Sequence, residues 1–210
     1  MATEKKKKLV RITSPAGTAR YPWLNNPDTQ FNVDGVYKVN LLIPNADAKD
    51  LCKVLDEHAA AAFADAKAQA KNPALAKQIT LAYPYAPFLD EAGEDTGMTE
   101  FKFKMNAKIK TFTGETKTLK PFIFDAKGKN LPVCPAVYGG SKLKINFCPA
   151  GYYAASSKQA GVSLRMNAVQ ILELVSGGGG NASGYGFGTE EGSFEGDTAP
   201  AMQAEGSSDF

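Results

Sequence analysis

The chain has 210 residues, 43% of them hydrophobic, which suits a globular domain with a sizeable core. All 24 basic residues lie before residue 176 together with 16 of the 22 acidic ones, so the body carries +8 and residues 176–210 carry −6. There is no run of roughly 18 apolar residues and no signal-peptide core, which argues against a membrane protein and favours a cytoplasmic one. A basic body indicates an anionic partner, most often nucleic acid.

Composition divides the chain into three predicted parts: a basic arm (1–8), one domain (9–175), and a Gly-rich linker with an acidic tail (176–210). Ten of the last 35 residues are Gly, and such a composition buries too little apolar surface to offset its ordering entropy. We therefore expect the tail to be disordered. Its negative charge predicts competition for the basic surface, and its terminal Phe210 is a candidate contact for another protein.

The first half of the domain predicts two short strands and one long helix. Residues 9–13 and 36–43 (VYKVNLLI) are the strand candidates, separated by a segment rich in Pro, Gly and Asn. Residues 47–71 predict the helix, which Asn45 or Asp47 would cap and residues 72–73 would end. Its apolar stripe comprises Leu51, Val54, Leu55, His58, Ala62 and Ala66.

In the second half of the domain, apolar and polar residues alternate with the period of a β-strand. The apolar side is predicted to comprise Phe101, Phe103, Met105, Ala107 and Ile109, with Lys or Asn between them. Turns are expected at 113–115 and 125–129, and further strands at 118–124, 142–148 and 161–175. The alternation slips near residues 169–171, which predicts a bulge or bend.

These elements predict a mainly β fold. Five or more bent strands, one long helix and no βαβ rhythm favour an oligonucleotide-binding (OB) barrel of about five antiparallel strands with an inserted helix.

The sequence offers little for catalysis, so we expect a protein without enzymatic activity, cofactor or metal. His58 is the single histidine and belongs to the apolar stripe of the helix. Cys52, Cys134 and Cys148 lack metal-ligand spacing and predict free thiols. The carboxylates of residues 90–95 leave a Mg²⁺-dependent nuclease open as an alternative, against the simpler interpretation of a solvated loop.

Lysines on the polar side of strands are the strongest candidates for phosphate contacts. Alternate residues of a strand lie about 6–7 Å apart, which matches an extended phosphodiester repeat. The predicted phosphate-binding residues are Lys102, Lys104, Lys108, Lys110, Lys142 and Lys144. Aromatic side chains beside such a groove can stack on bases, and the candidates are Tyr21, Trp23, Tyr138, Tyr152 and Tyr153. The alternative is that these lysines only solubilise or guard strand edges.

Several segments in order resemble the replication single-stranded DNA-binding proteins of short-tailed phages, of the gene 2.5 product type. They are residues 35–40 (GVYKVN), 43–45 (IPN), 99–104 (TEFKFK), 125–129 (DAKGK), 139–144 (GGSKLK) and 172–174 (LEL), followed by the acidic tail ending in Asp209 and Phe210. The resemblance spans roughly residues 10–210.

The resemblance implies an OB fold with one long helix and sequence-tolerant binding of single-stranded DNA in replication and recombination. It implies strand annealing, a homodimer, and location in the cytoplasm of a bacterial host. It also implies that the tail, with Glu205, Asp209 and Phe210, occludes the groove and recruits the phage polymerase and helicase-primase. The family's DNA-contacting aromatic corresponds to Tyr152 or Tyr153. Two alternatives remain: an RNA-binding module of cold-shock type, and an interaction protein acting mainly through its acidic tail.

Overall fold

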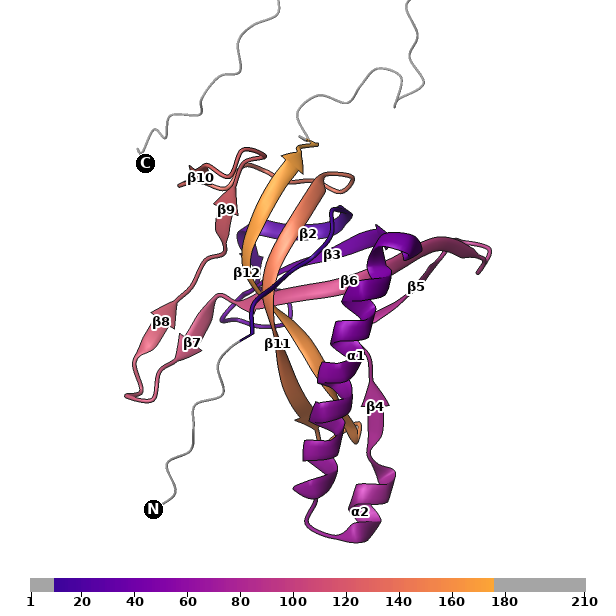
Figure 1. Cartoon of the computed structure of the whole chain (residues 1–210). Coiled ribbons are helices and arrows are strands. Elements are labelled where there is room, and N and C mark those ends of the chain that lie inside the picture. Colours follow the sequence, from indigo (N-terminus) through magenta and orange to yellow (C-terminus); the bar gives the residue numbers. More distant parts are fainter. Residues whose placement is uncertain (1–9, 176–210) are drawn as a thin grey trace, which may run out of the picture. The chain divides into compact units, whose positions relative to one another are not determined.

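Residues 10–175 are described in a computed structural model, and this part of the chain is mainly β, as predicted (Figure 1). Its strands are β1 (Ile12–Thr13), β2 (Gly17–Asp28), β3 (Val36–Pro44), β4 (Thr80–Ala82), β5 (Tyr85–Leu89), β6 (Asp95–Asn106), β7 (Lys108–Lys110), β8 (Thr116–Thr118), β9 (Phe122–Phe124), β10 (Asn130–Leu131), β11 (Lys142–Ala154) and β12 (Gln159–Glu173). Its helices are α1 (Asn45–Ala68) and α2 (Pro73–Gln78). Neither of these helices combines the length and apolar character that crossing a membrane requires. The predicted basic arm (1–8) and tail (176–210) lie outside the described residues.

Five long strands pair in a circuit that returns to its starting strand. β2 is antiparallel to β3, β3 to β6, β12 to β11 and β11 to β2, whereas β6 and β12 run parallel. Short strands add to this circuit, with β1 along β11, β4 and β9 along β12, and β5 along β6. β7 and β8 form a separate hairpin.

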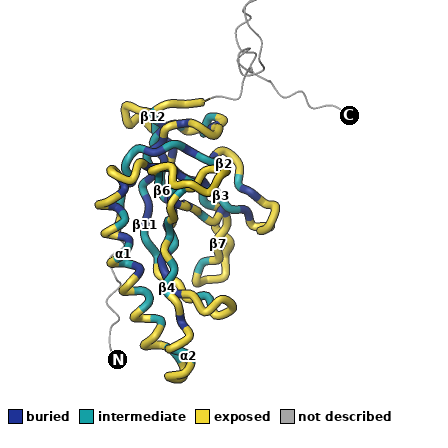
Figure 2. Tube along the Cα trace, turned by 90° about the vertical axis from the view of Figure 1, so that its right-hand side faces the viewer, coloured by how far each residue is buried: buried dark blue, intermediate teal, exposed yellow. Residues whose placement is uncertain are grey.

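The alternation predicted for β6 separates the core from the outer surface. Phe101 and Phe103 are buried, whereas Lys102 and Lys104 between and after them are exposed. The Phe103 ring meets that of Phe147 from β11 edge-on, with the centroids 5.1 Å apart. Figure 2 shows the buried stretches gathered where β2, β3, β6 and β11 come together. The predicted apolar row does not continue to Ile109, which is exposed because β7 has left the main sheet.

The predicted long helix, α1, is present between β3 and β4 in the chain. In space it packs against β11 and β12 (Figure 1). Its buried side chains are Ala48, Leu51, Leu55 and Ala59, and the predicted Val54 is exposed instead. The predicted cap is wrong, because no side chain caps α1. Asn45 accepts a hydrogen bond from the Thr99 hydroxyl on β6 at 2.8 Å instead.

Three elements differ from the sequence-based prediction. β2 occupies the segment rich in Pro and Asn, for which no strand was predicted. The single strand expected at 118–124 is divided into β8 and β9, because Pro121 lies between them and lacks a backbone N–H. The short helix α2 follows the end of α1, and the Asn72 side chain caps it by accepting the Leu75 N–H at 2.7 Å.

The predicted irregularity in the last strand is present. Two register shifts flank the predicted stretch of residues 169–171. Lys142 of β11 pairs with Glu173 and Leu143 with Ile171, so Leu172 is extra, and Asn146 pairs with Ala168 and Phe147 with Met166, so Asn167 is extra. The predicted turns also form, since the Gly114 N–H donates to Thr111 and the Gly128 N–H to Asp125. The bulge at Asn167 exchanges the inward and outward faces of β12, which shapes the surface described next.

Candidate nucleic-acid interface

A groove follows the outer face of β12 from Val162 to Gln170. It consists of four adjoining hollows of about 340, 590, 650 and 390 Å³. Neighbouring hollows share lining residues, with Lys104 and Tyr152 common to the first two, Asn167 to the middle two and Asn146 to the last two. The hollows therefore form one path, called the β12 groove below.

The β12 groove is strongly cationic. Seven basic side chains and no carboxylate occur among its described lining residues, and the basic ones are Arg11, Lys102, Lys104, Lys117, Lys120, Lys144 and Arg165. None of the seven is in an ion pair with another described residue. Unneutralised cations along one path produce a positive potential that attracts an extended polyanion.

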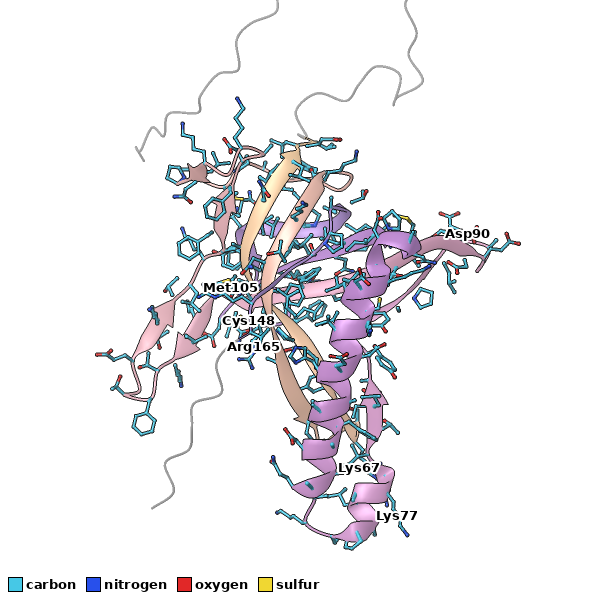
Figure 3. The ribbon with its side chains drawn as sticks, in the orientation of Figure 1. Lys67, Lys77, Asp90, Met105, Cys148 and Arg165 are labelled. Carbon is cyan, nitrogen blue, oxygen red and sulfur yellow. The ribbon has the colours of Figure 1, made fainter. Side chains whose placement is uncertain are left out.

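The centre of the groove is set by the pairing of β6 with β12. Lys104 is the register partner of Arg165 across the parallel junction, so both side chains project from the same face. Arg165 lines the same hollow as Met105, and Figure 3 labels both residues. On the other side of β6, Lys104 pairs with Lys38 of β3, but Lys38 is bound to the Asp28 carboxylate. The Lys38 ammonium and the Gln30 N–H hold the pKa of Asp28 below its usual value.

Aromatic side chains lie along the same groove, and they are Tyr83, Tyr85, Tyr152, Phe122 and Phe124. Tyr152 lines both hollows at the Lys104 end and is 39% exposed, so part of its surface is open to a ligand. Tyr85 is fixed more firmly, since its hydroxyl donates to Asp56 Oδ1 on α1 at 2.5 Å. Burial, reinforced by this acceptor, raises the pKa of Tyr85. The aromatic rings can stack on bases, and the cations between them can pair with phosphates.

The structure brings together only some of the residues predicted from the sequence. Four line the β12 groove, namely Lys102, Lys104, Lys144 and Tyr152. Tyr153 follows Tyr152 in β11 and lines a different hollow against α1, which Tyr152 also borders, but it does not line the β12 groove. The tail candidates Glu205, Asp209 and Phe210 lie outside the described residues.

The other predicted residues lie elsewhere in the described part of the chain. Lys108 and Lys110 are on the separate β7–β8 hairpin, and Lys142 forms a 3.0 Å ion pair with Glu173. Tyr21 and Trp23 are exposed on β2, where Tyr21 has a positive φ of 48°. The exposed Tyr138 precedes β11, and its N–H donates to the Val175 carbonyl.

Four groove cations were not among the predicted residues, namely Arg11, Lys117, Lys120 and Arg165. A signal for Arg165 exists, because it occupies a polar position between buried Leu164 and Met166 of an alternating strand. The others belong to short or exposed segments with no comparable pattern.

The residues considered for metal-dependent chemistry have structural roles or lie apart. The Asp90 carboxylate accepts the N–H groups of Ala92 and Glu94 at 2.9 Å, which organises its turn. Within residues 10–175, no three His, Cys, Asp or Glu side chains converge into a cluster that could hold a metal ion. His58 is half-buried on α1, as expected for a histidine at the rim of the core.

Comparison with solved structures places this arrangement among phage proteins. The crystal structure of gp2.5, a single-stranded DNA-binding protein encoded by bacteriophage T7, covers 90% of this chain and all of its own, with a TM-score of 0.64 and 31% identity. The protein from bacteriophage Enc34 in complex with single-stranded DNA covers 80% of this chain and 89% of its own, with a TM-score of 0.55. Its identity is 14%, so this second likeness concerns the fold alone.

Sequence comparison agrees. The single-stranded DNA-binding protein of Escherichia phage T7 is 35% identical over 186 residues, covering 80% of this chain and 78% of its own. That of Enterobacteria phage T3 is 32% identical over 204 residues, covering 90% and 86%. The family described as single-stranded DNA-binding protein, bacteriophage T7, matches residues 16–174. The chain therefore belongs to the T7-type family of phage single-stranded DNA-binding proteins, as the resemblance predicted.

Proposed function

We propose that the protein binds single-stranded DNA along the β12 groove, without turnover and without reading base sequence. The observation that carries this proposal is the continuous path lined by seven cations, several aromatic rings and no described carboxylate. Family membership and the binding function in the names of the relatives support the same conclusion.

In this proposal, phosphates follow the cations while unpaired bases stack on Tyr152 and its aromatic neighbours. Duplex DNA presents no free base faces, so stacking selects single strands. From Val162 to Gln170 the groove follows eight residue steps, or about 26 Å at the rise of a strand. An extended strand at roughly 6 Å per nucleotide would place about four nucleotides there, at the lower end of known OB site sizes.

The fold that best accounts for this site is an OB barrel. In an OB barrel, the first three strands pair in sequence order, the third pairs with the fifth in parallel, and the fourth closes onto the first. Assigning β2, β3, β6, β11 and β12 to these five positions reproduces the observed pairings. OB folds bind oligonucleotides over the face of the second and third strands, here β3 and β6, and of these two β6 lines the β12 groove with Lys102 and Lys104.

The proposal extends to the acidic tail and to the biological setting. Residues 176–210 carry −6 against a body of +8, so they can compete with DNA for the groove until a strand displaces them. The displaced tail would then present Glu205, Asp209 and Phe210 to the phage polymerase or helicase-primase, in the cytoplasm of a bacterial host. Strand annealing and a homodimer belong to the same proposal and follow from the resemblance alone.

The proposal is tested by titrating a fluorescein-labelled dT15 with the full chain and with a chain that ends at Val175. We expect tight binding that weakens with salt, preference over a duplex of equal length, and tighter binding by the shorter chain. Equal affinity for single strand and duplex would overturn the stacking mechanism. A matched RNA 15-mer tests the cold-shock alternative. If neither form binds nucleic acid, the interaction-protein alternative replaces this proposal.

A further inference from the structure

The β7–β8 hairpin stands apart from the main sheet. Its strands pair only with each other among the described residues, with Ile109 opposite Lys117 and Lys110 opposite Thr116. Every residue of both strands is exposed. Its base is closed by the Leu119 N–H, which donates to the Ala107 carbonyl at 2.7 Å. A two-stranded hairpin by itself is only marginally stable in water, so a ligand that packs on this one would stabilise it.

One face of this hairpin belongs to the β12 groove. Ile109 lines the same hollow as Tyr152 and Arg165, and its partner Lys117 lines the next hollow. Figure 1 shows the hairpin diverging from the β11–β12 pair, so the groove has β12 on one side and the hairpin on the other. Lys108 and Lys110 project from the opposite face, because residues next to Ile109 in a strand point away from it.

The tip of the hairpin presents a phenylalanine to solvent. Phe112 is fully exposed. The turn around it is well organised, since the Thr111 N–H donates to Glu115 O at 2.8 Å and the Thr111 and Thr113 hydroxyls lie 2.8 Å apart. Gly114 completes the turn with a φ of 86°, which favours glycine. The ring therefore stands on an ordered turn, although nothing in the described part of the protein covers it.

The charges beside Phe112 indicate what covers it. The segment 108–120 carries Lys108, Lys110, Lys117 and Lys120 against the single acid Glu115. An exposed aromatic ring among cations, continuous with a cationic groove, fits an anionic chain that also offers flat π-faces. Single-stranded nucleic acid meets both requirements, whereas an acidic protein surface supplies only the charge.

We propose that the β7–β8 hairpin is an arm that contacts single-stranded DNA from the wall opposite Tyr152, with Phe112 stacking on an unpaired base. This inference rests on the proposed function, because the strand in the β12 groove is the one that the arm contacts. Phe112 lies in the turn after β7, three residues beyond Ile109, and is therefore at most about 10 Å from it at the rise of a strand. The arm thus reaches a base that the groove itself does not hold, and it enlarges the footprint beyond about four nucleotides.

The test compares three substitutions in the full chain by anisotropy with labelled dT15. Phe112→Ala removes the ring, Phe112→Leu keeps an apolar side chain, and Phe112→Trp keeps a stacking surface. We expect Phe112→Ala and Phe112→Leu each to weaken binding by at least about fivefold, and Phe112→Trp to retain it. The added tryptophan should be quenched by dT15 when compared with the wild type, whose Trp23 gives the background signal.

The inference fails if the wild type binds dT15 and Phe112→Ala binds it equally well. An equal loss of affinity in Phe112→Leu and Phe112→Trp would also contradict stacking, because it would show that only the shape of the phenylalanine side chain matters. If the wild type itself does not bind, the proposed function fails instead, so the two failures are distinguishable. As a readout independent of affinity, dT15 should slow tryptic cleavage after Lys110 and Lys117, and a 15-base-pair duplex should not. Unchanged cleavage in saturating dT15 would contradict the contact.

Discussion

Lys104 on β6 and Arg165 on β12 are register partners across the parallel junction of the main sheet. They lie 61 positions apart in the chain, yet their side chains leave the same face and line the same hollow. No described ion pair neutralises either of them. This pairing places two free cations at the centre of the β12 groove, where each can meet a different phosphate.

The first prediction concerns Arg165. Replacing it with alanine removes one phosphate contact, so affinity for dT15 should fall on the order of threefold to tenfold. The slope of log affinity against log salt should become shallower by about 0.7. Lys77→Ala is the matched control, because Lys77 is also an exposed cation but lies on α2, at the far end of the molecule (Figure 3). Equal effects of the two substitutions would mean that only net charge matters.

The second prediction distinguishes two paths for the strand. A path along β12 passes Tyr152 and leaves out Trp23, which lines none of the groove hollows. Tyr152→Ala should therefore cost about 1–3 kcal/mol of binding free energy, whereas Trp23→Ala should change affinity less than about twofold. Tyr152→Phe, which keeps the ring, should bind like the wild type. A larger loss for Trp23→Ala would indicate that the strand crosses β2 and β3 instead.

The sequence predicted the parts of this site that depend on neighbouring residues, and it missed those that depend on contacts between residues far apart in the chain. The alternation of Phe101 and Phe103 with Lys102 and Lys104 is local, and the structure confirms it. The junction of β6 with β12 is non-local, so no pattern near Arg165 could associate it with Lys104. Lys142 has the same alternation as Lys144 but is paired with Glu173 at 3.0 Å, and that partner is 31 residues away.

Local irregularity explains the strand that was not predicted. In β2 the register shifts between Arg20 and Trp23, and again between Trp23 and Asp28, so no period of two survives. Pro22 and Pro27 further weaken the strand signal. Pairing with β3, rather than local propensity, makes this segment a strand.

A third prediction concerns the contact of β4 with β12. A Cβ atom on Gly161 would lie 2.2 Å from the Ala82 carbonyl oxygen, which is far inside van der Waals contact with the backbone. Gly161→Ala must therefore displace β4 and should lower the free energy of unfolding by about 3 kcal/mol. Gly139→Ala is the matched control, since its nearest neighbour would be 3.8 Å away. Urea denaturation measures both, and equal stabilities would contradict the close approach.

The last prediction concerns pH and the ion pair of Asp28 with Lys38. The ammonium of Lys38 and the N–H of Gln30 lower the pKa of Asp28 in the folded protein. A lowered folded pKa stabilises the fold above the unfolded value of about 3.9, and this stabilisation is lost as the pH falls through the folded pKa. Asp28→Asn should therefore be less stable than the wild type at pH 7, and the difference should shrink below about pH 4.

Urea denaturation of both proteins at pH 7, 5 and 3 measures this difference. Asp34→Asn is the control, because Asp34 is exposed and its carboxylate forms no described ion pair. A stability difference for Asp28→Asn that stays constant from pH 7 to pH 3 would show that the ionised carboxylate does not stabilise the fold. The expected convergence would show that Lys38 is held by Asp28, which leaves Lys104 and Arg165 as the free cations of that row.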